Sequence, residues 1–299
     1  EPLFLLYDAN RGGEVSWNQG VNINDGCNPS YNKYCPVPLI VTKDCDCEKT
    51  SVGCGAVAMG QIMWKWKWPL SYNWNNMPIQ LQEEDSNDIP LFLRDCGAKS
   101  KMNYNFYGSW TTIGNLTSAF HDFGYKSATY LREKWWANDA WYNIIKTELD
   151  CGRPVLFRGG EVLDTDIGNV HYFVIEGYDY NSPGYFYINW GWGKSAYHSR
   201  EQYSLPILRA YYNADYDYSD NQMAIVGISP TISNATKIIK DVAYNRIMTY
   251  RNELALESIN LPMENKSIIV ENGATYILKA KESISLNVGF EAKEGCEFS

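Results

Sequence analysis

The chain has 299 residues, of which 45% are hydrophobic and 15% aromatic, and this composition favours one sizeable core with a smaller second domain. Its formal net charge of -9 argues against nucleic acid and anionic membrane surfaces as partners, because neither attracts a net acid. No apolar run reaches the roughly 18 to 20 residues needed to cross a bilayer, so we predict no membrane span.

Residues 1 to 149 read as a loop-rich start followed by helices. The first 49 residues are rich in Asn, Gly, Pro and Cys, with one compact aromatic and polar cluster at Trp17-Asn18-Gln19-Gly20. An Ala- and Met-rich segment and three segments with helical apolar spacing follow. Thr50 or Ser51 is the predicted cap of the first helix. The predicted helices cover about 51–66, 89–98, 111–123 and 139–149.

The pattern changes after residue 153, where aromatic and β-branched runs alternate with Gly, Asn, Asp and Pro. Such runs are typical of strands. The predicted strands cover 154–158, 171–178, 185–190 and 223–228. Helices first and a sheet afterwards indicate an α+β fold with segregated halves, and a cleft between such halves is the natural place for a site.

A short polar link follows Pro230, and the remaining chain has fewer aromatic residues. Three short alternating segments at about ten-residue spacing, 267–270, 274–278 and 283–286, are predicted strands. We therefore predict two domains, a larger one at 1–230 and a small all-β module at 231–299.

Four of the eight cysteines, Cys27, Cys35, Cys45 and Cys47, are crowded ahead of Cys54. In an exported chain such crowding favours disulfides, and we predict two local disulfides among these four. Zinc is the less favoured alternative, because Cys45-Asp46-Cys47 lacks the usual gap between ligands and no histidine lies near it. No metal and no other cofactor is predicted.

Cys54 is the residue best placed for chemistry. It follows a turn and begins an apolar helix, where unpaired N–H groups and the helix dipole favour a thiolate and a lowered thiol pKa. That is what a cysteine nucleophile needs. The alternative, left open by this stretch alone, is a small buried apolar cysteine that only packs.

A nucleophilic cysteine needs a base, and the chain has three histidines, His121, His171 and His198. His121 lies in a predicted amphipathic helix and His198 in a polar loop, whereas His171 begins a strand after a glycine-bearing loop. A strand start beside such a loop suits a base that faces a cleft, so we favour His171 over a histidine that is only part of the core.

The same chemistry needs oxyanion donors and a group that orients the imidazole. The amide of Gln19 and the backbone N–H of Cys54 are the candidate donors. Asn189 follows a predicted strand and can accept the N–H of His171, while Trp190 and Trp192 can cover the Cys and His pair from water. Each of these residue types, taken singly, is common in loops or cores.

Four motifs in this order resemble the streptopain and interpain family of secreted bacterial cysteine peptidases over about residues 3–230. They are Trp17-Asn18-Gln19-Gly20, Val52-Gly53-Cys54-Gly55-Ala56-Val57-Ala58-Met59-Gly60-Gln61-Ile62-Met63, Gly168-Asn169-Val170-His171-Tyr172-Phe173-Val174-Ile175-Glu176-Gly177-Tyr178 and Asn189-Trp190-Gly191-Trp192-Gly193. The resemblance implies a papain-like fold of two subdomains. It also implies that Cys54 is the nucleophile, His171 the proton acceptor and Gln19 the oxyanion glutamine, with Trp190 and Trp192 sheltering the histidine.

The resemblance further implies a secreted, cell-surface or periplasmic bacterial enzyme made as a zymogen, with protein or peptide substrates and its own propeptide as inhibitor. Position 1 is Glu and no basic and apolar leader precedes the rest, so we expect that leader segments have been removed. Two functions remain as alternatives. One is a non-catalytic adhesin or binding protein on the same scaffold, and the other is an amide or acyl transferase that uses the same pair.

Some positions depart from the family pattern. Gly55 stands where Val is usual and Gly60 where Ala is usual, which predicts a helix less stable by up to about 1 kcal/mol per glycine. Val170 stands where Gly is usual, and a bulkier residue there can narrow the cleft. The predicted substrate-binding positions are Gly53, Gly168 and Val170, which belong to the motifs around Cys54 and His171.

Overall fold

The structure is a computed structural model, and its residues separate into two compact units. The first comprises Glu1–Leu149 and Arg153–Pro230, and the second comprises Asp150–Gly152 and Thr231–Ser299. The predicted domain boundary after residue 230 stays a prediction. The described residues are 2–20, 31–37, 49–82, 87–105, 108–133, 138–160, 170–193, 201–210 and 217–230, together with the strands between 256 and 298.

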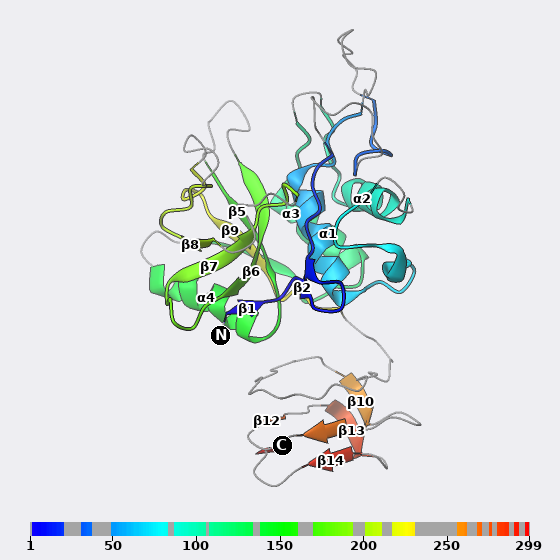
Figure 1. Ribbon diagram of the computed structural model, residues 1–299, viewed down its shortest axis with the longest axis vertical. Helices are drawn as coiled ribbons and strands as arrows, with labels where there is room; N and C mark the ends of the chain where they lie inside the picture. The colour runs from blue at the N-terminus through cyan, green and yellow to red at the C-terminus, as the bar shows by residue number, and fades with distance from the viewer. Residues whose placement is uncertain are drawn as a thin grey trace. The chain divides into compact units, whose positions relative to one another are not determined.

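The first unit contains a seven-stranded antiparallel sheet (Figure 1). Its order is β4-β9-β5-β6-β7-β8, with β1 paired to the end of β6. Every residue of β6 is buried, which explains why its middle, Tyr172 to Ile175, is a continuous apolar run rather than an alternation; the strand also buries His171 and Glu176. The strands are β1 Leu3–Phe4, β4 Thr129–Arg132, β5 Val155–Gly159, β6 His171–Tyr178, β7 Tyr185–Asn189, β8 Gln202–Ser204 and β9 Met223–Val226.

The four predicted helices and the four predicted strands of this unit are confirmed, and so is the α+β fold class. The helices are α1 Cys54–Trp66, α2 Asp88–Lys99, α3 Ile113–Asp122 and α4 Asn138–Asp150, with a short 3-10 turn, η1, at Trp74–Asn76. The sequence did not predict β4, whose residues are half-buried or exposed and show no apolar run.

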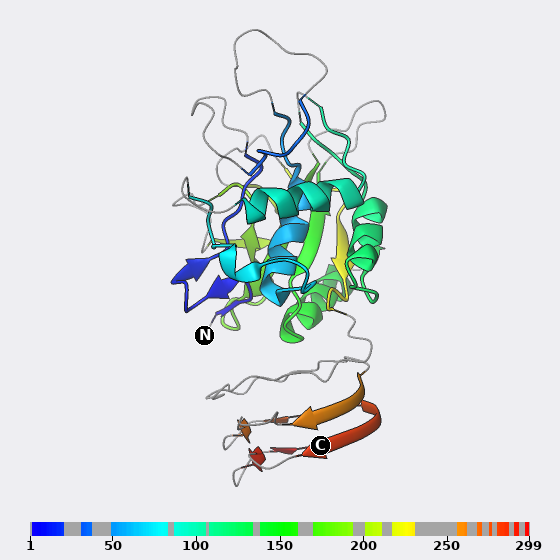
Figure 2. The same ribbon diagram turned by 90° about the vertical axis from the view of Figure 1, so that its right-hand side faces the viewer.

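Helix α1 is the central helix of this unit. It packs against β6 on one side and against α2 on the other, and the side view shows α2 crossing it (Figures 1 and 2). Every residue from Gly55 to Trp64 is buried, because the sheet and the other helices surround it. The Ala- and Met-rich composition of this segment suits a helix covered on all sides.

The two unusual glycines of α1 lie where neighbouring helices approach it. A Cβ at position 55 would lie 2.9 Å from Cδ1 of Leu116 in α3, and a Cβ at position 60 would lie 2.8 Å from Cδ2 of Leu93 in α2. Both distances are too short for a carbon contact. The glycines therefore lower helix propensity but permit close packing of α2 and α3 on α1.

The predicted side-chain cap of α1 is wrong. Gly53 occupies the N-cap position, and no side chain caps the helix. Ser51 Oγ instead accepts from the backbone N–H of Ser109 at 3.1 Å, and Ser109 Oγ donates to the Ser51 carbonyl at 2.6 Å. Thr50 Oγ1 donates to the carbonyl of Pro36 at 3.0 Å. Both hydroxyl groups therefore form hydrogen bonds with residues distant in sequence and do not cap the helix.

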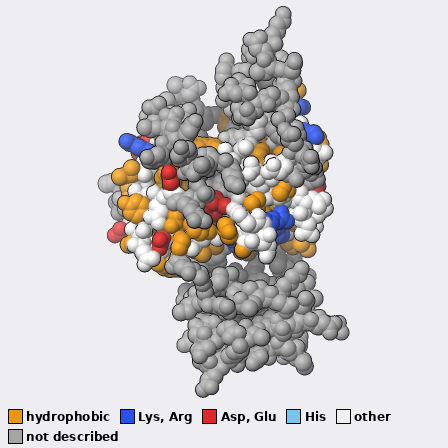
Figure 3. Space-filling model, in the orientation of Figure 1, with side chains coloured by type: hydrophobic (Ala, Val, Ile, Leu, Met, Phe, Trp, Pro, Cys, Tyr) orange, Lys and Arg blue, Asp and Glu red, His pale blue; other side chains and the backbone are white. Residues whose placement is uncertain are grey.

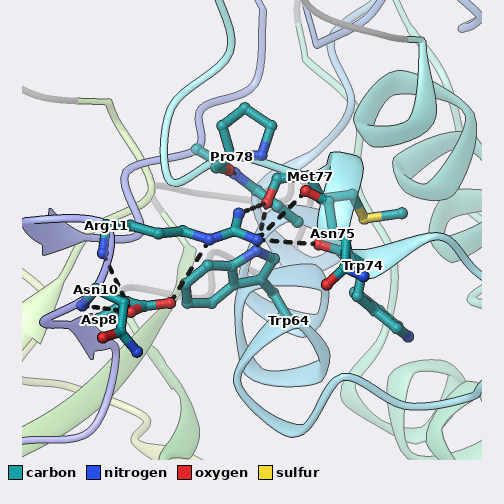
Figure 4. Close-up of polar contacts among 9 residues, drawn as sticks. Asp8, Asn10, Arg11, Trp64, Trp74, Asn75, Met77 and Pro78 are labelled. Carbon is teal, nitrogen blue, oxygen red and sulfur yellow. Dashed lines mark hydrogen bonds and ion pairs between the residues drawn. The ribbon is translucent and has the colours of Figure 1, made fainter.

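Arg11 ties the N-terminal hairpin, β2 Tyr7–Asp8 with β3 Gly13–Glu14, to the segment after α1 (Figure 4). Its guanidinium donates to the carbonyl oxygens of Trp74, Asn75 and Met77 and lies 5.6 Å from the centre of the Trp64 ring. The carboxylate of Asp8 lies 3.7 Å from Nε. One side chain thus joins three segments of the first unit.

The described strands of the second unit pair in parallel. They are β10 Leu256–Leu261, β11 Ile268–Val270, β12 Thr275–Tyr276, β13 Ala280–Leu286, β14 Phe290–Ala292 and β15 Glu297–Phe298. The pairs are β10 with β13, β11 with β14 and β12 with β15, so each strand pairs with the third one after it. The predicted strands overlap β11, β12 and β13. That these strands form a separate all-β domain stays a prediction.

The described surface carries charges of both signs. Acidic and basic side chains are interspersed with apolar ones on the face drawn in Figure 3. Among the described residues, no helix combines the length and apolar character needed to traverse a bilayer. The predicted absence of a nucleic-acid partner stays an expectation.

Candidate active site

Cys54 is the first residue of α1 and is half-buried, and its thiol is free. The preceding Gly53 has a φ of 88°, which a residue with a side chain rarely adopts, so the entry to the helix needs glycine. The backbone N–H of Tyr172 donates to the Cys54 sulfur. Because Tyr172 follows His171 in β6, this contact brings the start of α1 to the start of that strand.

His171 is buried at the start of β6, and its Nε2 lies 2.8 Å from the carbonyl oxygen of Trp190. A carbonyl oxygen can only accept a hydrogen bond, so Nε2 carries the proton in the neutral ring. Nδ1 then keeps a lone pair that can accept another proton. This is the tautomer that a base acting through Nδ1 requires.

The predicted contact between Asn189 and His171 is not formed. The side chain of Asn189 bonds to Val15, Glu14, Gln61 and Gly191, and the backbone carbonyl of the next residue, Trp190, faces the imidazole instead. A strand end can present either its side chain or its backbone to a neighbour, and sequence does not distinguish the two.

Four aromatic rings surround the imidazole. Their centres lie 5.0 Å away for Trp192, 5.5 Å for Tyr218, 5.9 Å for Phe173 and 6.2 Å for Trp190. The predicted sheltering role of the two tryptophans stays a prediction. Phe173 and Tyr218 were missed, although a residue two positions after His171 in a strand shares its face.

Burial disfavours both the thiolate of Cys54 and the imidazolium of His171. It raises the pKa of the Cys54 thiol, an effect partly offset by hydrogen bonds from the backbone N–H groups of Tyr172, Gly55 and Cys54 itself. Burial also lowers the pKa of His171 to about 4, although the bond to Trp190 acts in the opposite direction. The predicted lowered pKa of Cys54 is therefore wrong, because loss of water outweighs the donors at the helix start.

Gln19 lies beside the loop that enters α1. Its carbonyl accepts from the backbone N–H of Val52 at 3.1 Å, and its side chain is half-buried. The backbone N–H of Cys54 belongs to the first turn of the helix, where N–H groups have no partner within the helix. Both predicted oxyanion donors thus belong to segments that meet near the cysteine.

Two of the three predicted substrate-binding positions, Gly53 and Val170, lie within the described residues. A Cβ at Gly53 would lie 2.7 Å from the sulfur of Met102, so backbone geometry and packing already require glycine there. Val170 precedes β6 and is half-buried. Gly168 lies outside the described residues.

The other two histidines do not join this group within the described part of the chain. His121 lies in α3, and its Nε2 lies 2.7 Å from the carbonyl oxygen of Ala128. His198 lies outside the described residues.

The predicted disulfides that include Cys35 are wrong. Cys35 is a free buried thiol whose neighbours include Tyr104, a hydrogen-bond partner. Cys27, Cys45 and Cys47 lie outside the described residues. Among the residues that the structure describes, no three His, Cys, Asp or Glu side chains are grouped to hold a metal ion.

The cysteine thus lies at the start of a buried helix, and this helix packs against an antiparallel sheet in which a central strand begins with the histidine. This is the arrangement of papain-like cysteine peptidases. Interpain A of Prevotella intermedia, an active wild-type cysteine protease, has the same fold, with a TM-score of 0.58 and 21% identity over 76% of this chain and 94% of that one. A fragment of prointerpain A from the same organism has a TM-score of 0.54 and 20% identity, over 76% of this chain and 71% of that one.

Two sequence comparisons agree with the fold. The profile of the Peptidase C10 family matches residues 70–198. The thiol protease/hemagglutinin PrtT of Porphyromonas gingivalis is 28% identical over 216 residues, which are 69% of this chain. The chain spans 23% of the length of that relative. The predicted resemblance to the streptopain and interpain peptidases is therefore confirmed.

Proposed function

We propose that this chain is a cysteine endopeptidase that hydrolyses peptide bonds through an acyl-enzyme. The observation that carries the proposal is the hydrogen bond from the Tyr172 backbone to the Cys54 sulfur, because it joins the nucleophile to the strand of the base. The bond from His171 Nε2 to the Trp190 carbonyl supports it, since it leaves Nδ1 free to act as the base.

In the proposed reaction His171 Nδ1 takes the proton of Cys54, and the sulfur attacks the carbonyl carbon of the substrate. Proton transfer within the pair creates a thiolate and an imidazolium together, so the buried site gains no net charge. The amide of Gln19 and the N–H of Cys54 hold the oxyanion. The imidazolium then protonates the leaving amine, and water attacks the thioester, releases the acid and restores the thiol.

Replacing the nucleophile tests this function. Cys54→Ala should abolish peptide hydrolysis and labelling by a cysteine-directed epoxide, with an unchanged circular dichroism spectrum. Peptide mapping of the labelled wild-type protein should place the label on Cys54 rather than on Cys35, Cys96 or Cys151. Hydrolysis that persists in Cys54→Ala would refute the mechanism.

The name of the Porphyromonas gingivalis relative joins a protease to a hemagglutinin, which makes non-catalytic binding the second candidate function. An amide or acyl transferase would use the same pair of residues. Product analysis on a peptide library separates the three: hydrolysis gives a new carboxyl and a new amine, acyl transfer joins an added amine, and a binding protein leaves the peptides intact.

We also propose that the protein is an exported bacterial zymogen inhibited by its own propeptide. The prointerpain A fragment supports this, because a pro form of a protein with the same fold is known. Antibody detection in cell and culture fractions of the source bacterium tests it. We expect a longer inactive form and a shorter form outside the cytoplasm that reacts with the epoxide.

A further inference from the structure

Asn189 lies at the centre of a buried hydrogen-bond network. Its Nδ2 donates to the carbonyl of Val15 at 2.6 Å and to Oε1 of Glu14 at 3.0 Å. Its Oδ1 accepts from the N–H of Gly191 and from Nε2 of Gln61, both at 3.1 Å. Backbone groups have a fixed polarity, so they decide which end of the amide is oxygen. With both donors and both acceptor positions used, this side chain has one orientation.

The network reaches His171 through a single peptide group. The bond between Trp190 and Gly191 presents its N–H to Asn189 Oδ1 and its carbonyl to His171 Nε2, at 3.1 Å and 2.8 Å. The N–H contact is an Asx turn, which fixes the plane of that peptide. Hydrogen bonds at the two ends of one peptide also polarise each other. The direction of the carbonyl that faces His171 therefore depends on Asn189.

Gln61 holds the other side of Asn189. It is fully buried in the middle of α1, and its Nε2 donates to Asn189 Oδ1 at 3.1 Å and to the carbonyl of Trp17 at 3.3 Å. Its Oε1 is buried without a hydrogen-bond partner. A buried acceptor without a partner destabilises a fold, so an apolar residue would suit packing alone better. The two donor contacts are what this glutamine contributes.

We propose that Gln61 is a positioning residue for His171, acting through Asn189 and the Trp190–Gly191 peptide. It holds the imidazole in the tautomer with the proton on Nε2 and Nδ1 free. The hydrogen bonds of Gln61 go to Trp17 and Asn189 rather than to Cys54 or the imidazole, and Gln61 lies on the same helix as the nucleophile. That helix therefore positions both members of the pair, Cys54 at its first turn and His171 through Gln61. The catalytic meaning of this inference rests on the proposed function.

The first test reads the imidazole directly and needs no activity. The wild type, Gln61→Met and Ile62→Val are each labelled with 15N at their three histidines. Long-range 1H–15N spectra then show which ring nitrogen of each histidine carries the proton. We expect His171 of the wild type to show the Nε2–H tautomer, and Gln61→Met to show a mixture of tautomers. Ile62→Val is the control, because Ile62 is a fully buried apolar neighbour on the same helix. His121 is the internal reference.

The second test measures alkylation of Cys54 by iodoacetamide. We expect a rate roughly 10- to 100-fold lower in Gln61→Met, the size of effect seen when the hydrogen-bond partner behind a metal-bound histidine is lost, and a nearly unchanged rate in Ile62→Val. If His171 shows the same tautomer in Gln61→Met as in Ile62→Val, the positioning role is refuted. If the wild type cleaves no peptide but the tautomer still shifts, the proposed function fails and the positioning role stands.

Gln61→Glu replaces Gln61→Met if the latter does not fold. The shape is nearly the same, and the carboxyl has a proton to donate only while it is neutral. We expect the His171 tautomer to become mixed as that carboxyl ionises with rising pH. A His171 spectrum that matches the wild type on both sides of this titration would overturn the proposal.

Discussion

The backbone N–H of Val52 donates to the carbonyl of Gln19 at 3.1 Å, which holds the glutamine beside the loop that leads to Cys54. This contact uses backbone atoms alone, so it persists when the side chain of Gln19 is changed. A substitution there can therefore separate the chemistry of the amide from the structure of the loop.

We predict that Gln19→Ala lowers the turnover of a peptide substrate by on the order of 10²- to 10³-fold, because the proposed oxyanion donor is lost. Alkylation of Cys54 by iodoacetamide should change little, since that reaction forms no tetrahedral oxyanion. If alkylation slows as much as hydrolysis, Gln19 supports the loop or the thiol rather than the oxyanion.

The buried imidazole predicts a loss of stability in acid. The pKa of His171 is lowered to about 4, against an ordinary value of 6.5 in the unfolded chain, so the unfolded state binds the proton more tightly. The contribution of the neutral His171 ring to the free energy of unfolding is fully present above pH 6.5 and is lost as the pH falls through 4. The full difference is roughly 3 kcal/mol.

Urea unfolding at pH 7 and pH 4 measures this difference in Cys54→Ala, where no thiolate can pair with the ring. Adding His171→Gln should remove that share of the pH dependence, because glutamine does not titrate. An equal loss of stability with and without His171 would contradict the prediction, and the pKa itself can be read from the ring resonances.

The carboxyl of Glu176 predicts a pH effect of the opposite sign. Burial and the neighbouring Glu14 carboxyl raise the pKa of Glu176 well above 4.5, and Glu176 Oε2 accepts from the N–H of Leu6 at 3.1 Å. The folded state binds this proton more tightly than the unfolded state. Stability is therefore lost as the pH rises from about 4.5 toward the raised pKa.

Glu176→Gln should remove this loss, because an amide keeps an acceptor for Leu6 and a donor for Glu14 without titrating. We expect the free energy of unfolding of the variant to become larger, relative to that of the wild type, as the pH rises from 4.5 to 8, because only the wild type loses stability over this range. A constant difference over that range would mean that Glu176 does not hold a proton in the folded protein.

Gly177 is where β1 joins the sheet. A Cβ at this position would overlap the carbonyl oxygen of Leu3, which pairs with the end of β6. We predict that Gly177→Ala detaches β1, because main-chain atoms cannot move aside as a flexible side chain can. Amide hydrogen exchange of Leu5, whose N–H donates to the Glu176 carbonyl at 3.0 Å, should become faster.

Gly114→Ala in α3 is the matched control for that substitution. A Cβ there meets only Thr112 Oγ1, at 3.9 Å, and alanine favours helix. The free energy of unfolding should stay the same or rise by up to about 1 kcal/mol. Unchanged exchange at Leu5 in Gly177→Ala would contradict the pairing of β1 with β6.

Arg11 and Lys67 lie near the same indole ring. Lys67 Nζ lies 3.0 Å from the centre of the Trp64 ring, and burial, followed by the charge of Arg11, lowers the Lys67 pKa to about 7. We predict that Arg11→Gln raises this pKa, because one positive charge is removed. The pH dependence of reductive methylation, mapped by peptide, measures it.

The same substitution should also lower stability, by roughly 1 to 3 kcal/mol, because the carbonyls of Trp74 and Met77, in half-buried contacts, lose a charged donor; the third contact, to Asn75, is exposed. Arg209→Gln is a control, since Arg209 pairs with Asp217 on the exposed surface. A Lys67 pKa that does not rise in Arg11→Gln would show that the charge of Arg11 does not contribute to it.

The sequence by itself determined the helices of the first unit, its buried strands and the candidate pair Cys54 and His171, because apolar periodicity and turn residues are local signals. Only tertiary structure decided that Ser51 bonds to Ser109 rather than capping α1, that Cys35 is free, and that burial reverses the predicted pKa of Cys54. It also decided that the Trp190 carbonyl, rather than the Asn189 side chain, faces His171. Each of these four outcomes depends on which groups distant in sequence become neighbours in space and exclude water. A single sequence does not show which residues become neighbours.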